Sequence, residues 1–216
     1  MIRFEQVGMA ERLPTGITVL DRRLDGGIPA GSIVLLSADP ASQSELFLYE
    51  LTAERGTLYL TSIRSDQAVR DALDRVPGKV GNPTVRDVGG SAPLDGANRL
   101  VSNLPEKANL IVDVLDPLER AETARYREFL NQLQTHMINT QGLAVLHALD
   151  GTDVHPNRDL SEHMADVIFD LQTTVDGSEV INRMAVPKFR GGRALEETIK
   201  LQLADEVSID TSRDIA

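Results

Sequence analysis

Cysteine and tryptophan are absent from this chain of 216 residues, and aromatic side chains make up only 4% of it. Without cysteine there is no disulfide bond, no thiol nucleophile and no thiolate ligand for a metal. No apolar run approaches the roughly 18 residues that a membrane-spanning helix needs. The first residues also lack the basic and apolar regions of a signal peptide. We therefore predict a cytoplasmic protein that does not contact a membrane.

Lysine is scarce as well. Only four of the 22 basic residues are lysines, and 33 acidic residues bring the formal net charge to −11. An acid-rich, lysine-poor composition is typical of proteins from salt-accumulating haloarchaea, in which salt screens the repulsion between carboxylates. An ordinary acidic protein from a GC-rich bacterium is the alternative. Because nonspecific nucleic-acid binding draws on clustered lysine and arginine, the charge argues against such binding.

Apolar segments of strand length alternate with helical periodicity over most of the chain, which is typical of an α/β fold with a mostly parallel central sheet. Strands are predicted over residues 33–37, 57–61, 84–88, 110–114, 143–146 and 166–171. Helices are predicted over residues 44–55, 66–75, 95–103, 119–139 and 160–164. Asp66 and Asp95 are the predicted N-caps of two of these helices.

The pattern changes after Asp170. Residues 180–186 and 197–203 are strand-like, and a polar Asp-Gly turn precedes the first of them. We expect an antiparallel C-terminal extension at one end of the parallel sheet. Because no biased linker divides the chain, we predict a single domain over residues 1–216, with its core between about residues 13 and 207.

The turn after the predicted strand 33–37 lies where phosphate-binding loops of the pattern G-x-x-x-x-G-K-[ST] are found. Aligned on that pattern, the two glycines are replaced by Ala38 and Gln43. The lysine is replaced by Ser44 and the Ser/Thr by Glu45. The turn therefore has the setting of a nucleotide-binding loop without its chemical groups.

Two glycine-containing segments precede this turn. Residues 13–21 read Leu-Pro-Thr-Gly-Ile-Thr-Val-Leu-Asp, and residues 24–31 read Leu-Asp-Gly-Gly-Ile-Pro-Ala-Gly. They resemble the lead-in of the KaiC-like branch of the RecA superfamily of P-loop ATPases, and the resemblance extends to about residue 207. It implies a RecA-like three-layer sandwich in which Asp113 corresponds to the Walker B aspartate. It also implies that Lys188 and Arg190 belong to a K-x-R-G segment, which in assembled relatives reaches a neighbouring subunit's nucleotide.

The turn after the predicted strand 33–37 differs from the phosphate-binding loop of this family in its charged groups. Ser44 has no charge to replace the lysine, and Pro40 lacks a backbone N–H. Asp39 and Glu45 would place two carboxylates beside a polyphosphate. Each such contact at about 4–6 Å costs on the order of 1–4 kcal/mol.

A second catalytic element is also missing. After the strand 57–61 the family has a pair of glutamates that polarises the attacking water, whereas this chain has Ile63 and Arg64. Two losses in separate segments predict a pseudo-ATPase with no catalytic residue, no cofactor and no metal. Its degenerate nucleotide pocket is predicted to contain Ala38, Asp39, Gln43, Ser44, Glu45 and Asp113.

Other routes to chemistry find little support in the sequence. The four histidines lack metal-ligand spacing. Ser42 and Ser44 have no signature of an activating base near them, which argues against a serine hydrolase. Ser44 is instead predicted to cap the helix that follows, with Glu45 beside the positive helix end.

Three functional hypotheses remain. The leading one is a non-catalytic regulatory or assembly protein that acts through a protein partner or self-association, in signal transduction or transcription-linked control. Lys188, Arg190 and Arg193 form a basic turn that either is solvated or contacts such a partner. The second hypothesis is an atypical ATPase that binds ATP and Mg²⁺ with charge supplied by a neighbouring subunit. The third is an accessory protein of RecA-type DNA repair.

Overall fold

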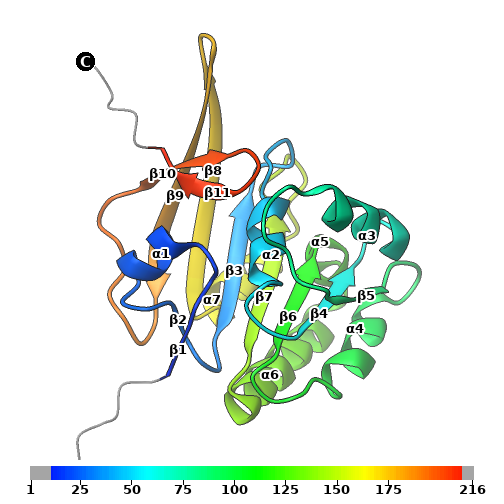
Figure 1. Ribbon diagram of the computed structural model, residues 1–216. Helices are drawn as coiled ribbons and strands as arrows, with labels where there is room; N and C mark the ends of the chain where they lie inside the picture. The colour runs from blue at the N-terminus through cyan, green and yellow to red at the C-terminus, as the bar shows by residue number, and fades with distance from the viewer. Residues whose placement is uncertain (1–10, 211–216) are drawn as a thin grey trace, which may run out of the picture.

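A large twisted sheet forms the centre of the computed structural model, which describes residues 11–210 (Figure 1). Within those residues the sheet has nine strands in the order β11-β10-β9-β8-β3-β7-β6-β4-β5. Neighbouring strands from β8 to β5 pair in parallel, whereas β9, β10 and β11 are antiparallel to their neighbours. The strands are β3 (Ile33–Ala38), β4 (Thr57–Thr61), β5 (Thr84–Asp87), β6 (Asn109–Asp113), β7 (Leu143–Leu149), β8 (Val167–Asp176), β9 (Glu179–Phe189), β10 (Ile199–Leu203) and β11 (Val207–Ile209).

Helices and apolar side chains cover both faces of the sheet, as the central strand β3 illustrates. Its successive side chains alternate between two apolar clusters, with Val34 and Leu36 in one and Ile33 and Leu35 in the other. The first cluster includes residues of α1 (Thr18–Arg23), α2 (Glu45–Leu51) and α3 (Asp66–Arg75). The second is built on α4 (Pro93–Val101), α5 (Asp116–Glu119), α6 (Thr123–Thr140) and α7 (Arg158–Met164). No helix within residues 11–210 is long and apolar enough to cross a bilayer.

The predicted α/β architecture is confirmed, including the parallel strands and the antiparallel extension. The predicted and observed boundaries of an element agree best where turn residues flank its apolar pattern. Helix α3, for example, spans the predicted residues 66–75. The helix predicted over 44–55 ends at Leu51, and the one predicted over 119–139 corresponds to α6, which begins at Thr123 after the short helix α5. The lead-in forms α1 and a two-stranded ribbon of β1 (Arg12–Leu13) and β2 (Ile28–Pro29), neither of which was predicted.

Both predicted N-caps are wrong. The backbone of Ser65 is extended, and its hydroxyl accepts a hydrogen bond from the Ala68 N–H at 3.2 Å, so Ser65 caps α3 and Asp66 is its first residue. Helix α4 begins at Pro93, because proline needs no N–H partner in the first turn, and Asp95 therefore lies inside the helix.

Gly27 has a steric reason for being glycine. Its φ is +119°, a backbone conformation that residues other than glycine rarely adopt. A Cβ atom added to Gly27 would lie 2.2 Å from the Leu13 carbonyl oxygen. Leu13 pairs with Ile28 in the β1–β2 ribbon, so the two backbones cannot separate without breaking that pairing.

We expect Gly27→Ala to lower the free energy of unfolding by at least about 2 kcal/mol, because it combines backbone strain with a clash. Gly56→Ala is the matched control, since no atom lies within 4 Å of the added Cβ. The control should change stability by no more than about 0.5 kcal/mol. Urea denaturation measures both, and equal effects would contradict the steric explanation.

Candidate functional site

The candidate site lies at the carboxyl edge of the parallel strands. Three strands end there side by side, with β7 between β3 and β6, and this edge is where open α/β sheets bind ligands. A small pocket of about 140 Å³ opens at this edge. Its lining includes Ser44, Arg64, Asp113 and His147.

Asp113, the last residue of β6, is the centre of a buried polar cluster. Its Oδ2 accepts a hydrogen bond from the Tyr59 hydroxyl at 2.6 Å and from Arg64 Nη2 at 3.3 Å. Its Oδ1 lies 2.8 Å from His147 Nδ1. On the other side of the imidazole, His147 Nε2 lies 3.0 Å from Ser44 Oγ. Asp113, His147 and Ser44 are 6%, 2% and 2% exposed, so water contributes little to their solvation.

These contacts determine the charge of the cluster. Burial by itself would raise the pKa of Asp113, but the hydrogen bonds from His147 and Tyr59 and the charge of Arg64 outweigh it, so the pKa lies below its ordinary value of 3.8. Burial and the neighbouring carboxylate raise the pKa of Tyr59 well above 10.0. Asp113 is therefore ionised at neutral pH, and Tyr59 is a neutral donor.

Arg64 closes the cluster on its solvent side. Its Nη2 also donates to the Tyr49 hydroxyl at 2.8 Å, while its carbonyl oxygen accepts from the Thr61 hydroxyl at 2.7 Å. Burial would lower the pKa of Arg64, but the hydrogen bond to Tyr49 and the nearby acidic groups raise it above its ordinary value. The guanidinium thus stays charged beside Asp113.

Only some of the residues predicted to form the nucleotide pocket lie together in the structure. Ser44, Glu45 and Asp113 line the pocket, whereas Asp39 and Gln43 are exposed in the turn before α2. Ala38 ends β3, is buried, and its carbonyl oxygen accepts from the Asp150 N–H at 2.8 Å. Asp39 bonds its own turn, accepting from the Ala41 N–H at 2.6 Å.

Ser44 does not cap α2 as predicted. It holds the N-cap position, but its backbone is already helical and its hydroxyl makes no capping bond. The hydroxyl contacts His147 instead. Local sequence pattern does not reveal this partner, because it is 103 residues away. A signal does exist: His147 directly follows the apolar run 143–146, which places it near the end of a strand, as Asp113 is.

The three predicted basic residues lie apart from this site. Lys188 pairs with Ile168 in the β8–β9 ladder, near the start of β8 and therefore at the opposite edge of the sheet. Its Nζ donates to the carbonyl oxygens of Glu162 and His163 at 2.7 and 2.9 Å, and Arg190 Nη2 donates to that of His163 at 2.8 Å. Both side chains thus cap the carboxyl end of α7. Arg193, which is exposed, pairs with Glu196. Contact with a partner remains a prediction.

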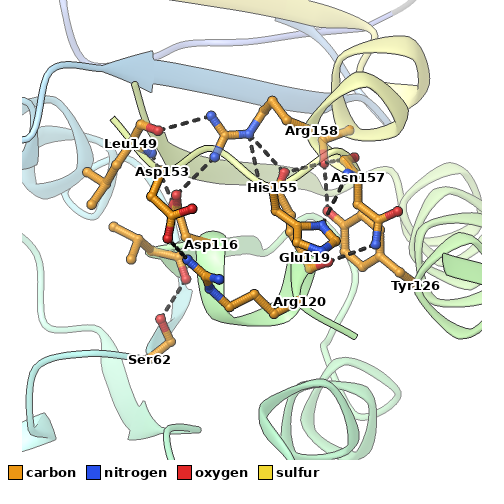
Figure 2. Close-up of polar contacts among 12 residues, drawn as sticks. Ser62, Asp116, Glu119, Arg120, Tyr126, Leu149, Asp153, His155, Asn157 and Arg158 are labelled. Carbon is orange, nitrogen blue, oxygen red and sulfur yellow. Dashed lines mark hydrogen bonds and ion pairs between the residues drawn. The ribbon is translucent and has the colours of Figure 1, made fainter. Parts of the chain in front are cut away.

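A second buried network stands beside the pocket, centred on Arg158 (Figure 2). Arg158 Nε donates to Glu119 Oε1 at 2.9 Å, Nη2 to Asp116 Oδ1 at 3.1 Å, and Nη1 to the Leu149 carbonyl oxygen at 3.1 Å. The Asn157 amide donates to the Glu119 carbonyl oxygen at 2.7 Å. The network ties α5 and α7 to the end of β7, two residues beyond His147.

We expect Asp113→Asn to lower the free energy of unfolding by about 2 kcal/mol at pH 7, because it removes charge-assisted hydrogen bonds. Since the folded-state pKa of Asp113 is depressed, its contribution is present above about pH 4 and is lost as the pH falls through that lower value. The gap between variant and wild type should therefore narrow from pH 7 to pH 3 in urea denaturation. Asp74→Asn, at an exposed position of α3, is the control. A gap that widens in acid would contradict the assignment.

We expect Arg158→Ala to lower stability by roughly 3–5 kcal/mol, because it leaves Glu119, which is fully buried, without its cation. Arg120→Ala removes the exposed ion pair with Asp153, also drawn in Figure 2, and should cost far less stability, because water solvates both charges. Thermal unfolding compares the two variants. Similar losses would show that burial does not distinguish these pairs.

Comparisons with known proteins identify the family and the fold. The family of unknown function DUF7125 matches residues 12–216. The crystal structure of the KaiC-like protein PH0186 from Pyrococcus horikoshii OT3 superimposes with a TM-score of 0.73 at 17% identity, over 93% of this chain and 99% of that one. The DNA repair protein RadA of Mycolicibacterium smegmatis is 34% identical over 73 residues, which are 32% of this chain and only 16% of RadA. The predicted KaiC-like, RecA-like fold is thereby confirmed, and the chain belongs to the DUF7125 family.

Proposed function

We propose that this protein is a KaiC/RecA-like pseudo-ATPase, a regulatory or assembly protein that acts through contacts with a protein partner or with its own copies. The setting we propose is signal transduction or transcription-linked control, and the acid-rich, lysine-poor composition suggests a salt-adapted host. One observation supports the proposal above the others. The strand-end carboxylate that the resemblance assigns to nucleotide chemistry, Asp113, is already bound by the chain's own Tyr59, Arg64 and His147.

Magnesium does not fit this arrangement. Mg²⁺ requires near-octahedral oxygen ligands and usually keeps several waters. Asp113 instead has hydrogen-bond donors on both oxygens and a guanidinium at 3.3 Å. A divalent cation at that carboxylate would be repelled by Arg64, at a cost on the order of several kcal/mol at an effective dielectric near 20.

A triphosphate does not fit either. Phosphate-binding loops use consecutive backbone N–H groups and a lysine. Pro40 offers no N–H, Ser44 directs its hydroxyl to His147, and the carboxylate-bearing Glu45 lines the same pocket. At about 140 Å³ the pocket is also small compared with the roughly 300–1,000 Å³ of typical ligand sites.

The fold itself is compatible with a regulatory role but does not establish one, because RecA-like folds serve many functions. At 17% identity the KaiC-like structure supports the architecture alone. What favours regulation is the combination of a retained fold with a nucleotide position filled by the protein's own side chains.

An atypical ATPase is the alternative. In one chain, Lys188 and Arg190 lie at the opposite edge of the sheet from the pocket, so only a neighbouring subunit could supply their charge. This alternative predicts that ATP changes the size of the protein in light scattering. A DNA repair accessory role is suggested by the RadA match over 73 residues, and retarded single-stranded DNA in a gel would support it.

We expect isothermal titration of the wild-type protein with Mg-ATP in molar KCl to give no saturable heat up to millimolar nucleotide. Asp113→Asn, titrated in parallel, shows whether any heat observed comes from this pocket. Micromolar binding that is lost in the variant, with release of phosphate, would refute the pseudo-ATPase. Heat that persists in the variant would come from another place on the chain.

A further inference from the structure

We propose that Ser44 is an activated nucleophile, with His147 as its general base and Asp113 as the carboxylate that positions His147, and that it accepts the acyl group of a small neutral ester. This inference does not rest on the pseudo-ATPase proposal, because it concerns the hydroxyl of Ser44 and not nucleotide binding. Each hypothesis can fail without the other.

The three side chains are arranged as nucleophile, base and orienting group. Ser44 Oγ lies 3.0 Å from His147 Nε2, and His147 Nδ1 lies 2.8 Å from Asp113 Oδ1. Both distances fall within the roughly 2.6–3.2 Å that such relays require. They come from three separate segments, the start of α2 and the strands β7 and β6, so the arrangement is recognised by geometry and not by order in the sequence.

The protonation pattern follows from the partners of Asp113. An ionised carboxylate only accepts hydrogen bonds, so His147 Nδ1 must carry the proton of that contact. In the neutral imidazole this leaves a lone pair on Nε2, which faces Ser44 Oγ. In that neutral state the Ser44 hydroxyl donates to Nε2, as a serine must before its proton is removed. Tyr59 and Arg64 support the pattern, because both donate to Asp113 Oδ2 and leave Oδ1 to the imidazole.

The Ser44 hydroxyl is not used as a helix cap. It holds the N-cap position of α2 but makes no capping hydrogen bond. Its hydroxyl is instead committed to His147, which is itself buried. A serine needed only to start the helix would bond the helix backbone.

The pocket next to Ser44 limits the substrate. Its volume of about 140 Å³ is below the roughly 300–1,000 Å³ of typical ligand sites, so it suits a small group such as an acetyl group. Glu45, in the same lining, disfavours anionic substrates. Arg64 is the cationic side chain of that lining, and its charge would stabilise an oxyanion that develops there. A short-chain neutral ester is therefore the substrate class that fits.

The reaction balances without any cofactor. As Ser44 Oγ bonds the ester carbonyl carbon, its proton moves to His147 Nε2, and the carbon–oxygen bond to the alcohol breaks. The departing oxygen takes the proton from Nε2, which leaves an acyl-serine. Water then attacks the acyl carbon and gives its proton to Nε2. The bond between the acyl carbon and Ser44 Oγ breaks, Oγ takes that proton from Nε2, and the carboxylic acid is released.

The test uses p-nitrophenyl acetate on the full-length wild-type protein, with the acetylated sites mapped by mass spectrometry. Ser91, which is exposed on the loop before α4, is an internal reference for an ordinary serine. General-base assistance predicts acetylation of Ser44 at least about 100-fold faster than of Ser91. Ser44→Ala should abolish the fast phase of p-nitrophenolate release, and Ser91→Ala should leave it unchanged.

The base is tested with His147→Gln, whose folding is checked by circular dichroism. If the variant folds, its acetylation of Ser44 should fall to the rate of Ser91, and unchanged acetylation would overturn the role of His147. If the variant does not fold, the ratio of the Ser44 and Ser91 acetylation rates in the wild-type protein decides between the outcomes. Acetylation of wild-type Ser44 no faster than that of Ser91, or acetyl groups confined to lysines, would overturn the proposal.

Discussion

The site depends on keeping one carboxylate charged in a place that water hardly reaches. An isolated buried carboxylate is too costly to remain ionised, so Asp113 requires donors on both oxygens. Tyr59 and Arg64 supply them on one side and His147 on the other. These donors come from β4, the loop after it, and β7, so the charge of Asp113 links adjacent parts of the sheet edge. Loss of any donor leaves part of a buried charge unsatisfied.

Internal pairing of this kind stabilises the carboxyl edge of the sheet without a contribution from a ligand. In a site that awaits a ligand, polar groups are left to be satisfied by that ligand. Here the carboxylate, the imidazole and the hydroxyl of Ser44 satisfy one another. The pocket that remains is small, and the free energy of the cluster is gained on folding rather than on binding.

The features that could be predicted from the sequence are those that depend on local residue pattern. The position of β4 and the span of α3 follow from apolar periodicity and flanking turn residues, and both agree with the structure. Asp113 was recognised because it closes an apolar strand. The contact between Ser44 and His147 was not predicted, because it depends on the strand order that places β7 between β3 and β6. The N-cap of α3 was misplaced by one residue, since Ser65 and Asp66 are both good caps and only backbone conformation decides between them.

The Arg158 network restrains the strand β7, which carries His147 of the Asp113 cluster. Leu149, which lines the pocket, donates its N–H to Asp116 Oδ2 at 3.1 Å, and its carbonyl oxygen accepts from Arg158. The last residue of β7 is thus held at both backbone groups, and His147 lies two residues earlier on the same strand. A strand held in this way limits the movement of the imidazole relative to Asp113 and Ser44. Such rigidity suits the proposed relay, because its groups must be held within about 0.5 Å of the productive geometry.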